Sequence, residues 1–357
     1  MREFILPVLC LSIAGCGDGG VARSSEEGEV VGESDKELIV VAAPRAGDPY
    51  YADQADAIFE FHIAYAEAIE GKDDLLVLTD EATFSRYAES LGKSRVAIAP
   101  QEDIWTRDFS LSNASAPLMF RYTAAGQGGG RNGQDTADDV QEVLAEVMEA
   151  AGLTFAESDL LNDGGNYVDD YAGMAVVSRK FLVDNELGED EARALIIEQT
   201  GAQHIAFIEA DEQGGLEHAD GVVAFIEPGV LVTNSYPEDP DYEAALISDL
   251  KKGLPGVRLH QITTPYDGSE IFDERFGSAC GLYTNMLVTP DRIYLPQFGI
   301  PEDAEALEAI REWTKKEVVP VRSEAVCQMG GGVRCMSWQL SGQNARKLQD
   351  WADRSKL

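Results

Sequence analysis

A cysteine that follows three consecutive glycines near the C-terminus is the residue best placed for nucleophilic chemistry. The segment reads Gly330-Gly331-Gly332-Val333-Arg334-Cys335. Consecutive glycines permit a tight turn, and they leave no Cβ to block a ligand that approaches the backbone. Such a loop can present a thiolate to a small planar group. A glycine turn followed by a buried structural thiol would have the same sequence, so the motif alone does not decide between the two.

Three further segments supply the other groups that cysteine catalysis needs. They are Trp105-Thr106-Arg107-Asp108, Asp163-Gly164-Gly165-Asn166 and Glu217-His218-Ala219-Asp220. Together they add one titratable base and at least two carboxylates to the nucleophile. His218 and Asp220 alternate as residues of a strand do, so we expect both side chains on one side of a sheet. A purely structural His–Asp pair is the alternative.

Sequence motifs of several other enzyme classes are absent. The chain contains no Walker phosphate loop, His-Glu-x-x-His helix, paired Cys-x-x-Cys motif or Gly-x-Ser-x-Gly elbow. Residues 128–133 match Gly-x-Gly-x-x-Gly, but no strand end precedes them, so we interpret them as an active-site or surface loop. Besides His218 there are His62, inside an apolar helix, and His204 and His260, beside strands. None of these three has the spacing of metal ligands.

The charge balance is strongly acidic. The 357 residues include 64 acidic and 28 basic side chains, with a net charge of -36, and 44% are hydrophobic. This length suits one large domain or two ordinary ones. An acidic surface repels phosphate backbones, which argues against nucleic-acid binding. The same surface attracts a guanidinium or amine substrate, although the charge also serves solubility.

The N-terminus has the pattern of a bacterial lipoprotein signal. An apolar run at 4–14 follows Arg2 and is too short to span a bilayer. It ends at Ile13-Ala14-Gly15-Cys16, which resembles a lipobox, and an ordinary signal peptide is the alternative. We therefore predict a signal peptide at 1–15, a lipidated Cys16 with a flexible acidic tether at 16–36, and a catalytic domain at 37–357. The protein is expected in the bacterial cell envelope, on the periplasmic or extracellular face, with the lipid anchor as its membrane contact.

The cysteine count permits one disulfide. Cys10 leaves with the signal and Cys16 carries lipid, so Cys280, Cys327 and Cys335 remain in an oxidising compartment. One disulfide plus one free thiol is the simplest arrangement. If Cys335 is the nucleophile, Cys280 and Cys327 are the candidate pair, although all three could be free.

Hydrophobic periodicity from residue 37 onward predicts an α/β protein without an obvious linker inside 37–355. Predicted strands lie at 38–41, 75–78, 95–98, 174–178, 222–226, 229–233, 286–288, 292–295 and 318–321. Predicted helices lie at 56–69 and 81–91, from a cap at Asp135-Thr136 to about residue 151, and at 302–316, where Lys315-Lys316 occupy the last turn.

The chain resembles the agmatine deiminase and bacterial peptidylarginine deiminase family of guanidino-group modifying enzymes in its motifs and their order. The motifs described above that match are Trp105-Thr106-Arg107-Asp108, Gly164-Gly165-Asn166, His218-Ala219-Asp220 and Gly330-Gly331-Gly332-Val333-Arg334-Cys335. The resemblance runs from about residue 37 to the end. Further matching segments are Pro237-Glu238-Asp239-Pro240-Asp241-Tyr242, Tyr283-Thr284-Asn285 and Pro296-Gln297-Phe298-Gly299. The resemblance implies a five-bladed α/β propeller (the pentein fold) with pseudo-fivefold symmetry and an active site on its axis. It also implies hydrolysis of a guanidinium to a ureido group and ammonia, without a metal or organic cofactor.

The resemblance also implies residue roles. Cys335 would attack the guanidinium carbon and form a covalent thiouronium intermediate. His218 would protonate the departing ammonia and then deprotonate the incoming water. Asp108 and Asp220 would accept hydrogen bonds from the guanidinium. Residues with substrate-binding or supporting roles would be Trp105, Arg107, Asn166, Asn285 and Gly332. Because two carboxylates disfavour a thiolate, we expect the bound cation to assist ionisation of the thiol.

Two departures from the family pattern bear on the substrate. Agmatine deiminases usually read Gly-Gly-Asn-Ile-His-Cys, whereas Gly331-Gly332-Val333-Arg334-Cys335 is closer to arginine deiminase loops. The arginine pair that clamps a peptide carboxylate is missing from Arg121-Tyr122-Thr123-Ala124-Ala125-Gly126, although Arg131 could reach one. The missing arginine pair favours agmatine, because agmatine has no carboxylate to clamp. The predicted export favours peptidylarginine, because enzymes of polyamine pathways usually lie in the cytoplasm. An amidinotransferase, a methylarginine hydrolase or a non-catalytic guanidine-binding lipoprotein are the further alternatives.

Overall fold

The computed structural model describes residues 36–112, 116–211, 215–265 and 276–355. The predicted signal peptide, the predicted lipidation site Cys16 and nearly all of the predicted tether lie outside these residues. Within the described ranges, no helix combines the length and hydrophobicity that a bilayer span requires.

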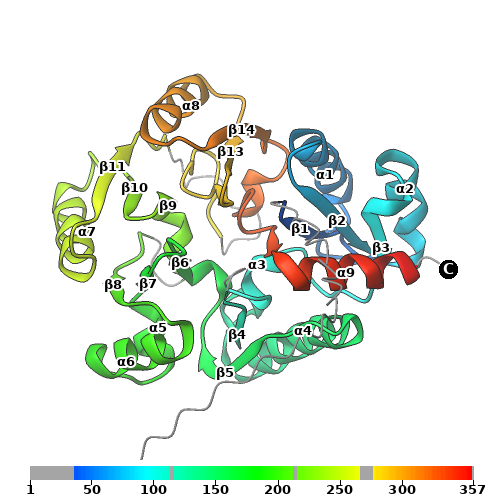
Figure 1. Cartoon of the computed structure of the whole chain (residues 1–357), viewed down its shortest axis with the longest axis horizontal. Helices are drawn as coiled ribbons and strands as arrows, with labels where there is room; N and C mark the ends of the chain where they lie inside the picture. Colours follow the sequence, from blue (N-terminus) through cyan, green and yellow to red (C-terminus); the bar gives the residue numbers. More distant parts are fainter. Residues whose placement is uncertain (1–35, 113–115, 212–214, 266–275, 356–357) are drawn as a thin grey trace, which may run out of the picture. The chain divides into compact units, whose positions relative to one another are not determined.

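The strands of the described residues form five separate sheets (Figure 1). In spatial order, the strands of the first sheet are β15 (Trp338–Leu340), β1 (Leu38–Ala42), β2 (Asp74–Thr79) and β3 (Val96–Ile98). The others are β4 (Leu118–Arg121) with β5 (Ala156–Leu161); β6 (Tyr167–Asp169), β7 (Met174–Ser178) and β8 (His204–Ile208); β9 (Val223–Glu227), β10 (Val230–Asn234) and β11 (Arg258–Ile262); and β12 (Leu287–Val288), β13 (Arg292–Gln297) and β14 (Glu317–Arg322).

One pairing pattern recurs between these sheets. In each of the three-stranded sheets the central strand pairs antiparallel with one neighbour and parallel with the other. The first sheet has the same pattern around β1, which pairs antiparallel with β15 and parallel with β2. β4 and β5 pair in parallel.

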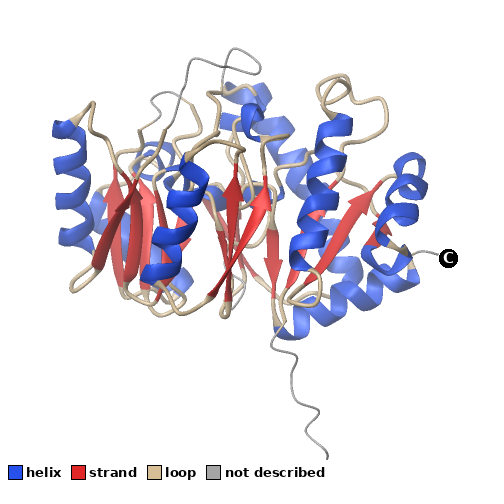
Figure 2. Ribbon diagram, turned by 90° about the horizontal axis from the view of Figure 1, so that it is seen from above, coloured by secondary structure: helices blue, strands red, loops and turns tan. Residues whose placement is uncertain are grey.

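The longer helices lie outside the sheets in Figure 1, whereas α3 (Thr106–Phe109) lies near the centre, and Figure 2 shows most helices and strands running roughly parallel to one another. The longer ones are α1 (Ala55–Ile69), α2 (Glu81–Leu91), α4 (Gly130–Ala151), α6 (Glu189–Thr200), α7 (Pro240–Gly253), α8 (Glu302–Trp313) and α9 (Gly342–Arg354); α3 (Thr106–Phe109) and α5 (Lys180–Asp184) are short. The side chains of Asp80 and Asp239 cap α2 and α7, because each accepts a hydrogen bond from a backbone N–H in the first turn.

The apolar sequence of β1 follows from burial on both faces. Ile39 and Val41 belong to one hydrophobic cluster with residues of α1, and Val40 belongs to another with residues of α4 and α9. A strand covered on both sides has no solvent face, so it shows a continuous apolar run rather than alternation. This is why the first strand could be predicted directly from the sequence.

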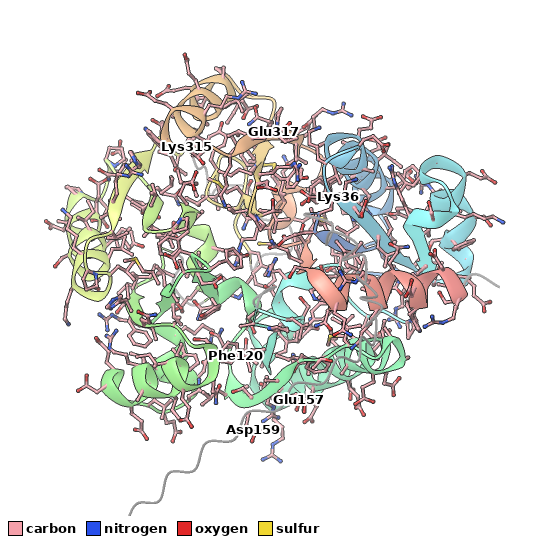
Figure 3. The ribbon with its side chains drawn as sticks, viewed as in Figure 1. Lys36, Phe120, Glu157, Asp159, Lys315 and Glu317 are labelled. Atoms are coloured by element: carbon pink, nitrogen blue, oxygen red, sulfur yellow. A yellow bond between two sulfur atoms is a disulfide. The ribbon has the colours of Figure 1, made fainter. Side chains whose placement is uncertain are left out.

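Most predicted elements are confirmed within a residue or two, but two helix boundaries are wrong. α4 begins at Gly130, so Asp135-Thr136 lie inside the helix and 130–133 form its first turn rather than a loop. Gly133 N–H already donates to Gly129 O at 3.2 Å. α8 ends at Trp313, because Glu227 accepts hydrogen bonds from Thr314 Oγ1 and Lys315 N. Lys315 therefore lies beyond the helix and shortly before Glu317, the first residue of β14; both residues are labelled in Figure 3.

The predicted disulfide is present. Cys280 and Cys327 are bonded, with their Cα atoms 4.9 Å apart and 47 positions between them in the sequence. Cys335 is a free thiol. Of the arrangements that the cysteine count allowed, the structure contains one disulfide and one thiol.

Candidate active site

Two cavities meet at the thiol of Cys335. The larger, of about 330 Å³, is also lined by Trp105 and Asp108. The smaller, of about 70 Å³, is also lined by His218, Asp220 and Asn285. The structure thus brings together a nucleophile, a base and two carboxylates that are widely separated in the sequence. The 3₁₀ turn Gly164–Asn166 contacts both α3 and the 3₁₀ turn Ala219–Gly221, and these three elements carry or adjoin several of these groups.

Asn285 holds the nucleophile at both its side chain and its backbone. Asn285 Nδ2 donates to Cys335 Sγ at 3.0 Å, and Cys335 N donates to Asn285 Oδ1 at 3.3 Å. Gly331 lies directly against Trp105, since a Cβ at this position would be 2.3 Å from the indole ring. The glycine is therefore required by the close approach of Trp105, and the loop and the cavity wall are built together.

His218 is held by Asp163 and not by Asp220. His218 Nε2 lies 2.9 Å from Asp163 Oδ2, and His218 Nδ1 lies 3.7 Å from Asp108 Oδ1. The expected strand geometry at 218–220 is wrong, because His218 immediately precedes the 3₁₀ turn Ala219–Gly221. Asp163 is 1% exposed and also accepts hydrogen bonds from the backbone N–H and the hydroxyl of Thr123.

Asp220 forms an ion pair with Arg334, which lies in the glycine loop where the sequence differs from that of agmatine deiminases. Arg334 Nη1 donates to Asp220 Oδ2 at 2.6 Å, and Nη2 donates to Tyr167 O at 2.9 Å. Both side chains are largely buried. The carboxylate of Asp220 is therefore partly neutralised by a guanidinium of the protein itself. Neither Asp163 nor Arg334 was among the predicted site residues.

Asp108 is a buried carboxylate with an unpartnered oxygen. Its Oδ1 has no hydrogen-bond partner, and the 3.7 Å to His218 Nδ1 is too long for a hydrogen bond. Burial raises the pKa of Asp108, the charge of His218 opposes that rise, and Asp163 and Asp220 add to it. An unsatisfied buried carboxylate oxygen is energetically unfavourable, and a bound cation with N–H donors would remove the penalty.

The titration of the site is set by its carboxylates. Burial lowers the pKa of His218, but Asp108 and Asp163 outweigh that effect and raise the pKa to about 10. Burial raises the pKa of the Cys335 thiol well above its ordinary value, and Asp220 and Asp108 raise it further. Asn285 opposes this shift through its hydrogen bond to the sulfur. Without a ligand the site therefore rests as a charged imidazolium and a neutral thiol.

The Gly164-Gly165 pair lets the catalytic groups approach the backbone. A Cβ on Gly164 would be 2.0 Å from Arg107 O, and one on Gly165 would be 2.5 Å from His218 Nδ1 and 2.9 Å from Asp108 Oδ1. No real Cβ occupies such positions. The two glycines of Asp163-Gly164-Gly165-Asn166 are therefore explained by close contact with the site.

We expect Gly165→Ala to lower kcat/KM for a guanidine substrate by about a hundredfold, since the new methyl group displaces His218 and Asp108 from each other. Steady-state kinetics would measure the change. Gly188→Ala is the matched control, because an added Cβ there meets nothing within 4 Å. Equal activity of both variants would contradict the steric argument.

The other predicted residues divide into two groups. Trp105 lines the larger cavity, and Gly332 lies beside Asn285, where a Cβ would be 3.2 Å from Oδ1. Arg107 and Asn166 line neither cavity, although both were predicted to bind substrate. Arg107 is buried and its backbone N–H donates to Cys335 O at 3.2 Å.

Asn166 holds the backbone around His218. Its Oδ1 accepts hydrogen bonds from Ser178 N at 2.8 Å and Ala219 N at 3.2 Å. Its side chain is thus occupied within the protein. The remaining histidines lie elsewhere: His62 is buried with Nδ1 3.1 Å from the hydroxyl of Tyr87, as its apolar helix predicted, and His260 stacks on Trp313.

The sequence and the structure both have relatives of known class. The family model of the Porphyromonas-type peptidyl-arginine deiminases matches residues 32–340. A Selenomonas ruminantium protein named "Putative agmatine deiminase" is 25% identical over 320 residues, which cover 76% of this chain and 84% of that protein.

Two solved structures share the fold. The agmatine deiminase of C. jejuni superimposes with a TM-score of 0.69 and 16% identity, covering 86% of this chain and 94% of that one. The agmatine deiminase of Enterococcus faecalis has a TM-score of 0.67 and 19% identity, with the same coverage. At these identities, the similarity to solved structures establishes a common fold.

Proposed function

The chain belongs to the Porphyromonas-type peptidyl-arginine deiminase family, whose members are hydrolases of guanidino groups, and we propose that its substrate is agmatine or a similar free guanidine. The products would be a ureido compound, N-carbamoylputrescine in the case of agmatine, and ammonia. The observation that carries this proposal is that Asp108, a buried carboxylate whose Oδ1 has no hydrogen-bond partner, lines the same cavity as the free thiol of Cys335.

A guanidinium matches this site in charge and shape. Its N–H groups would donate to Asp108 and to the remaining acceptor positions of Asp220, and both bonds would be charge-assisted. The cation would bring positive charge next to Cys335 and favour its thiolate. The thiolate would attack the guanidinium carbon, and the imidazolium of His218 would give its proton to the leaving ammonia. The neutral imidazole would then deprotonate the water that hydrolyses the thiouronium intermediate.

The larger cavity supports a substrate with a second positive charge. Besides Asp108, its lining includes Asp48, Glu102 and Asp103, and its described lining residues include no lysine or arginine. A distal ammonium group would be attracted there, whereas a distal carboxylate would be repelled. This charge distribution favours agmatine over free arginine or a C-terminal peptidylarginine.

Peptidylarginine is the second candidate, because the family model that matches the chain is one of peptidyl-arginine deiminases. The test is to incubate the purified full-length protein with agmatine, free arginine and arginine peptides with free or blocked C-termini. Ureido product and ammonia are both measured, which also separates hydrolysis from amidino transfer. Turnover of agmatine ahead of the peptides is the expected result. Preference for a blocked arginine peptide would replace agmatine by protein citrullination.

The pH dependence should reveal thiol ionisation that the substrate assists. We expect the acid limb of kcat to lie at least about one pH unit below that of kcat/KM, because the bound cation lowers the raised pKa of Cys335. Activity should fall again above about pH 10, where His218 loses its proton. Initial rates over a range of substrate concentrations and pH values measure both limbs. Coincident acid limbs would contradict the proposed assistance.

We also propose that the five sheets are the blades of an α/β propeller of the pentein type with pseudo-fivefold symmetry. The recurring pattern of one antiparallel and one parallel pairing in four sheets supports a repeated structural unit. The similarity to agmatine deiminase structures supports the same assignment. Asp108, Asp220 and Cys335 would then lie where the blades meet.

We further propose that residues 1–15 are a signal peptide, that Cys16 is lipidated, and that a tether at 16–36 holds the catalytic domain, 37–357, at the cell envelope. The disulfide between Cys280 and Cys327 supports an oxidising compartment. In a bacterial host, Cys16→Ser should move the protein from the membrane fraction to the soluble fraction. Unchanged membrane association of that variant would remove the lipid anchor from the proposal.

A further inference from the structure

The disulfide joins the two chain segments that hold the nucleophile. One segment, 279–285, runs from the disulfide to Asn285, and the other, 327–335, runs from the disulfide to Cys335. We propose that the Cys280–Cys327 bond positions Cys335 by keeping it within hydrogen-bonding distance of Asn285. Full activity would then require the oxidised protein. This inference rests on the proposed function of the same site.

The first segment is a series of short turns that begins at the disulfide. Ala279 N donates to Cys327 O at 2.8 Å, next to the bond itself. Leu282 N donates to Ala279 O at 3.1 Å, and Asn285 N donates to Leu282 O at 3.2 Å. Because each turn rests on the preceding one, the position of Asn285 depends on how Cys280 is held.

The second segment leaves the disulfide through a 3₁₀ turn, Cys327–Met329. Gly330 N donates to Cys327 O at 3.1 Å, and Gly330 has a φ of 96°, which favours glycine. The segment returns to the first one at its far end, where Arg334 N donates to Asn285 O at 3.2 Å. Three consecutive glycines lie between these two attachments, so this segment has little stiffness of its own.

The two segments are thus tied together at both ends, by a covalent bond at one and by the Asn285–Cys335 contacts at the other. Without the disulfide, the near ends of the two segments would keep the hydrogen bond from Ala279 N to Cys327 O, and Cys327 N would still donate to Ser323 O at 3.0 Å. Neither bond fixes Cys280 itself. Ala279, Leu282 and Gly330 also line the smaller cavity with Cys335. A shift at the disulfide would therefore move the wall against which the thiol reacts.

Cys280 is the more exposed partner of the disulfide, and we expect a small reductant to approach the bond from its side. Cys327 is 2% exposed, whereas Cys280 is partly exposed. A dithiol such as dithiothreitol would break the S–S bond in a two-electron reduction. Its thiolate attacks one protein sulfur and expels the other as a thiolate, which leaves a mixed disulfide. Its second thiol then attacks the reagent sulfur of that mixed disulfide, so the products are two protein thiols and the cyclic disulfide of the reagent.

Loss of the bond should lower kcat far more than it changes KM. Asp108, which would bind the guanidinium, lies in α3 and is not part of either segment. The position of Cys335 relative to the guanidinium carbon, by contrast, depends on both. We expect kcat to fall about ten- to a hundredfold, with KM changed less than about threefold.

The experiment compares the oxidised full-length protein, the same protein reduced with dithiothreitol after folding, and a Cys280→Ser/Cys327→Ser double variant. Turnover is measured with agmatine and with the best guanidine found above. The second readout is the pH profile of Cys335 alkylation by iodoacetamide, with the modified peptide quantified by mass spectrometry. The double variant treated with the reductant controls for effects on any other group. Circular dichroism establishes which samples remain folded.

The expected result is a reduced protein and a double variant that stay folded, share the loss of kcat, and alkylate Cys335 with a shifted pH profile. Reduction of the wild type after folding keeps the test valid if the double variant does not fold. Unchanged kcat with a lower melting temperature would overturn the proposal, because the bond would then be only a stabilising crosslink. If the oxidised protein turns over no guanidine, the proposed function fails, and the alkylation profile still decides whether the bond positions Cys335.

Discussion

Replacing Cys335 with alanine is expected to lower turnover of the guanidine substrate by at least about 10⁴-fold. The reason is covalent: without the sulfur, no thiouronium intermediate can form, and the resonance-stabilised guanidinium reacts with water extremely slowly. Cys335 is the free thiol of the described part of the chain, and it lines both cavities of the site. Ammonia release and ureido product formation are the measurements.

The same variant should fold as well as the parent. Cys335 lines both cavities and takes no part in the disulfide, so replacing its small side chain removes little packing. Thermal unfolding should therefore shift only slightly. Cys335→Ser should still bind the substrate in calorimetry, because Asp108 is untouched. Loss of folding in both variants would identify Cys335 as a structural thiol instead.

Asp163→Asn should produce the second largest loss, about 10²- to 10³-fold in kcat. Asp163 accepts from Nε2 of His218 and thereby directs Nδ1 toward Asp108 and the reacting groups. Its charge also helps to raise the pKa of His218. An amide removes that charge, so less of His218 stays protonated at alkaline pH, and its NH₂ group can face the imidazole and misorient the ring. The alkaline limb of the pH profile should therefore move to lower pH.

Asp73→Asn is the matched control for this change. Asp73 is also a buried aspartate that accepts hydrogen bonds, from Glu37 N, Arg292 and Tyr294, and it lines neither cavity of the site. Both variants should lose stability, since each leaves donors without a full acceptor. Only Asp163→Asn should lose kcat and shift the pH profile. A parallel loss in both variants would mean that Asp163 acts through folding alone.

The parts of the fold that the sequence predicted are those with a strong local signal. β1, β2 and β7 are short buried runs, and α2 has a capping aspartate and an amphipathic pattern. β5 was missed because it is an exposed edge: Glu157 and Asp159 point away from the ribbon (Figure 3). α9 was missed because most of its residues are polar, and its buried residues, Leu348 and Ala352, are too few to give a clear helical periodicity. Both elements are stabilised by their neighbours rather than by their own composition.

The chemistry of the site was contained in the sequence by itself. The glycine loop before Cys335, the His218 segment and the Asp108 segment predicted a nucleophile, a base and a carboxylate, because these residue types and motifs carry their chemistry wherever the chain places them. The pairings were decided only by the tertiary structure. His218 is hydrogen-bonded to Asp163, 55 positions away in the sequence, and Arg334 is hydrogen-bonded to Asp220, 114 positions away. Hydrogen bonds, Coulomb interactions and desolvation depend on distance and burial in space, and no spacing along a chain specifies either one.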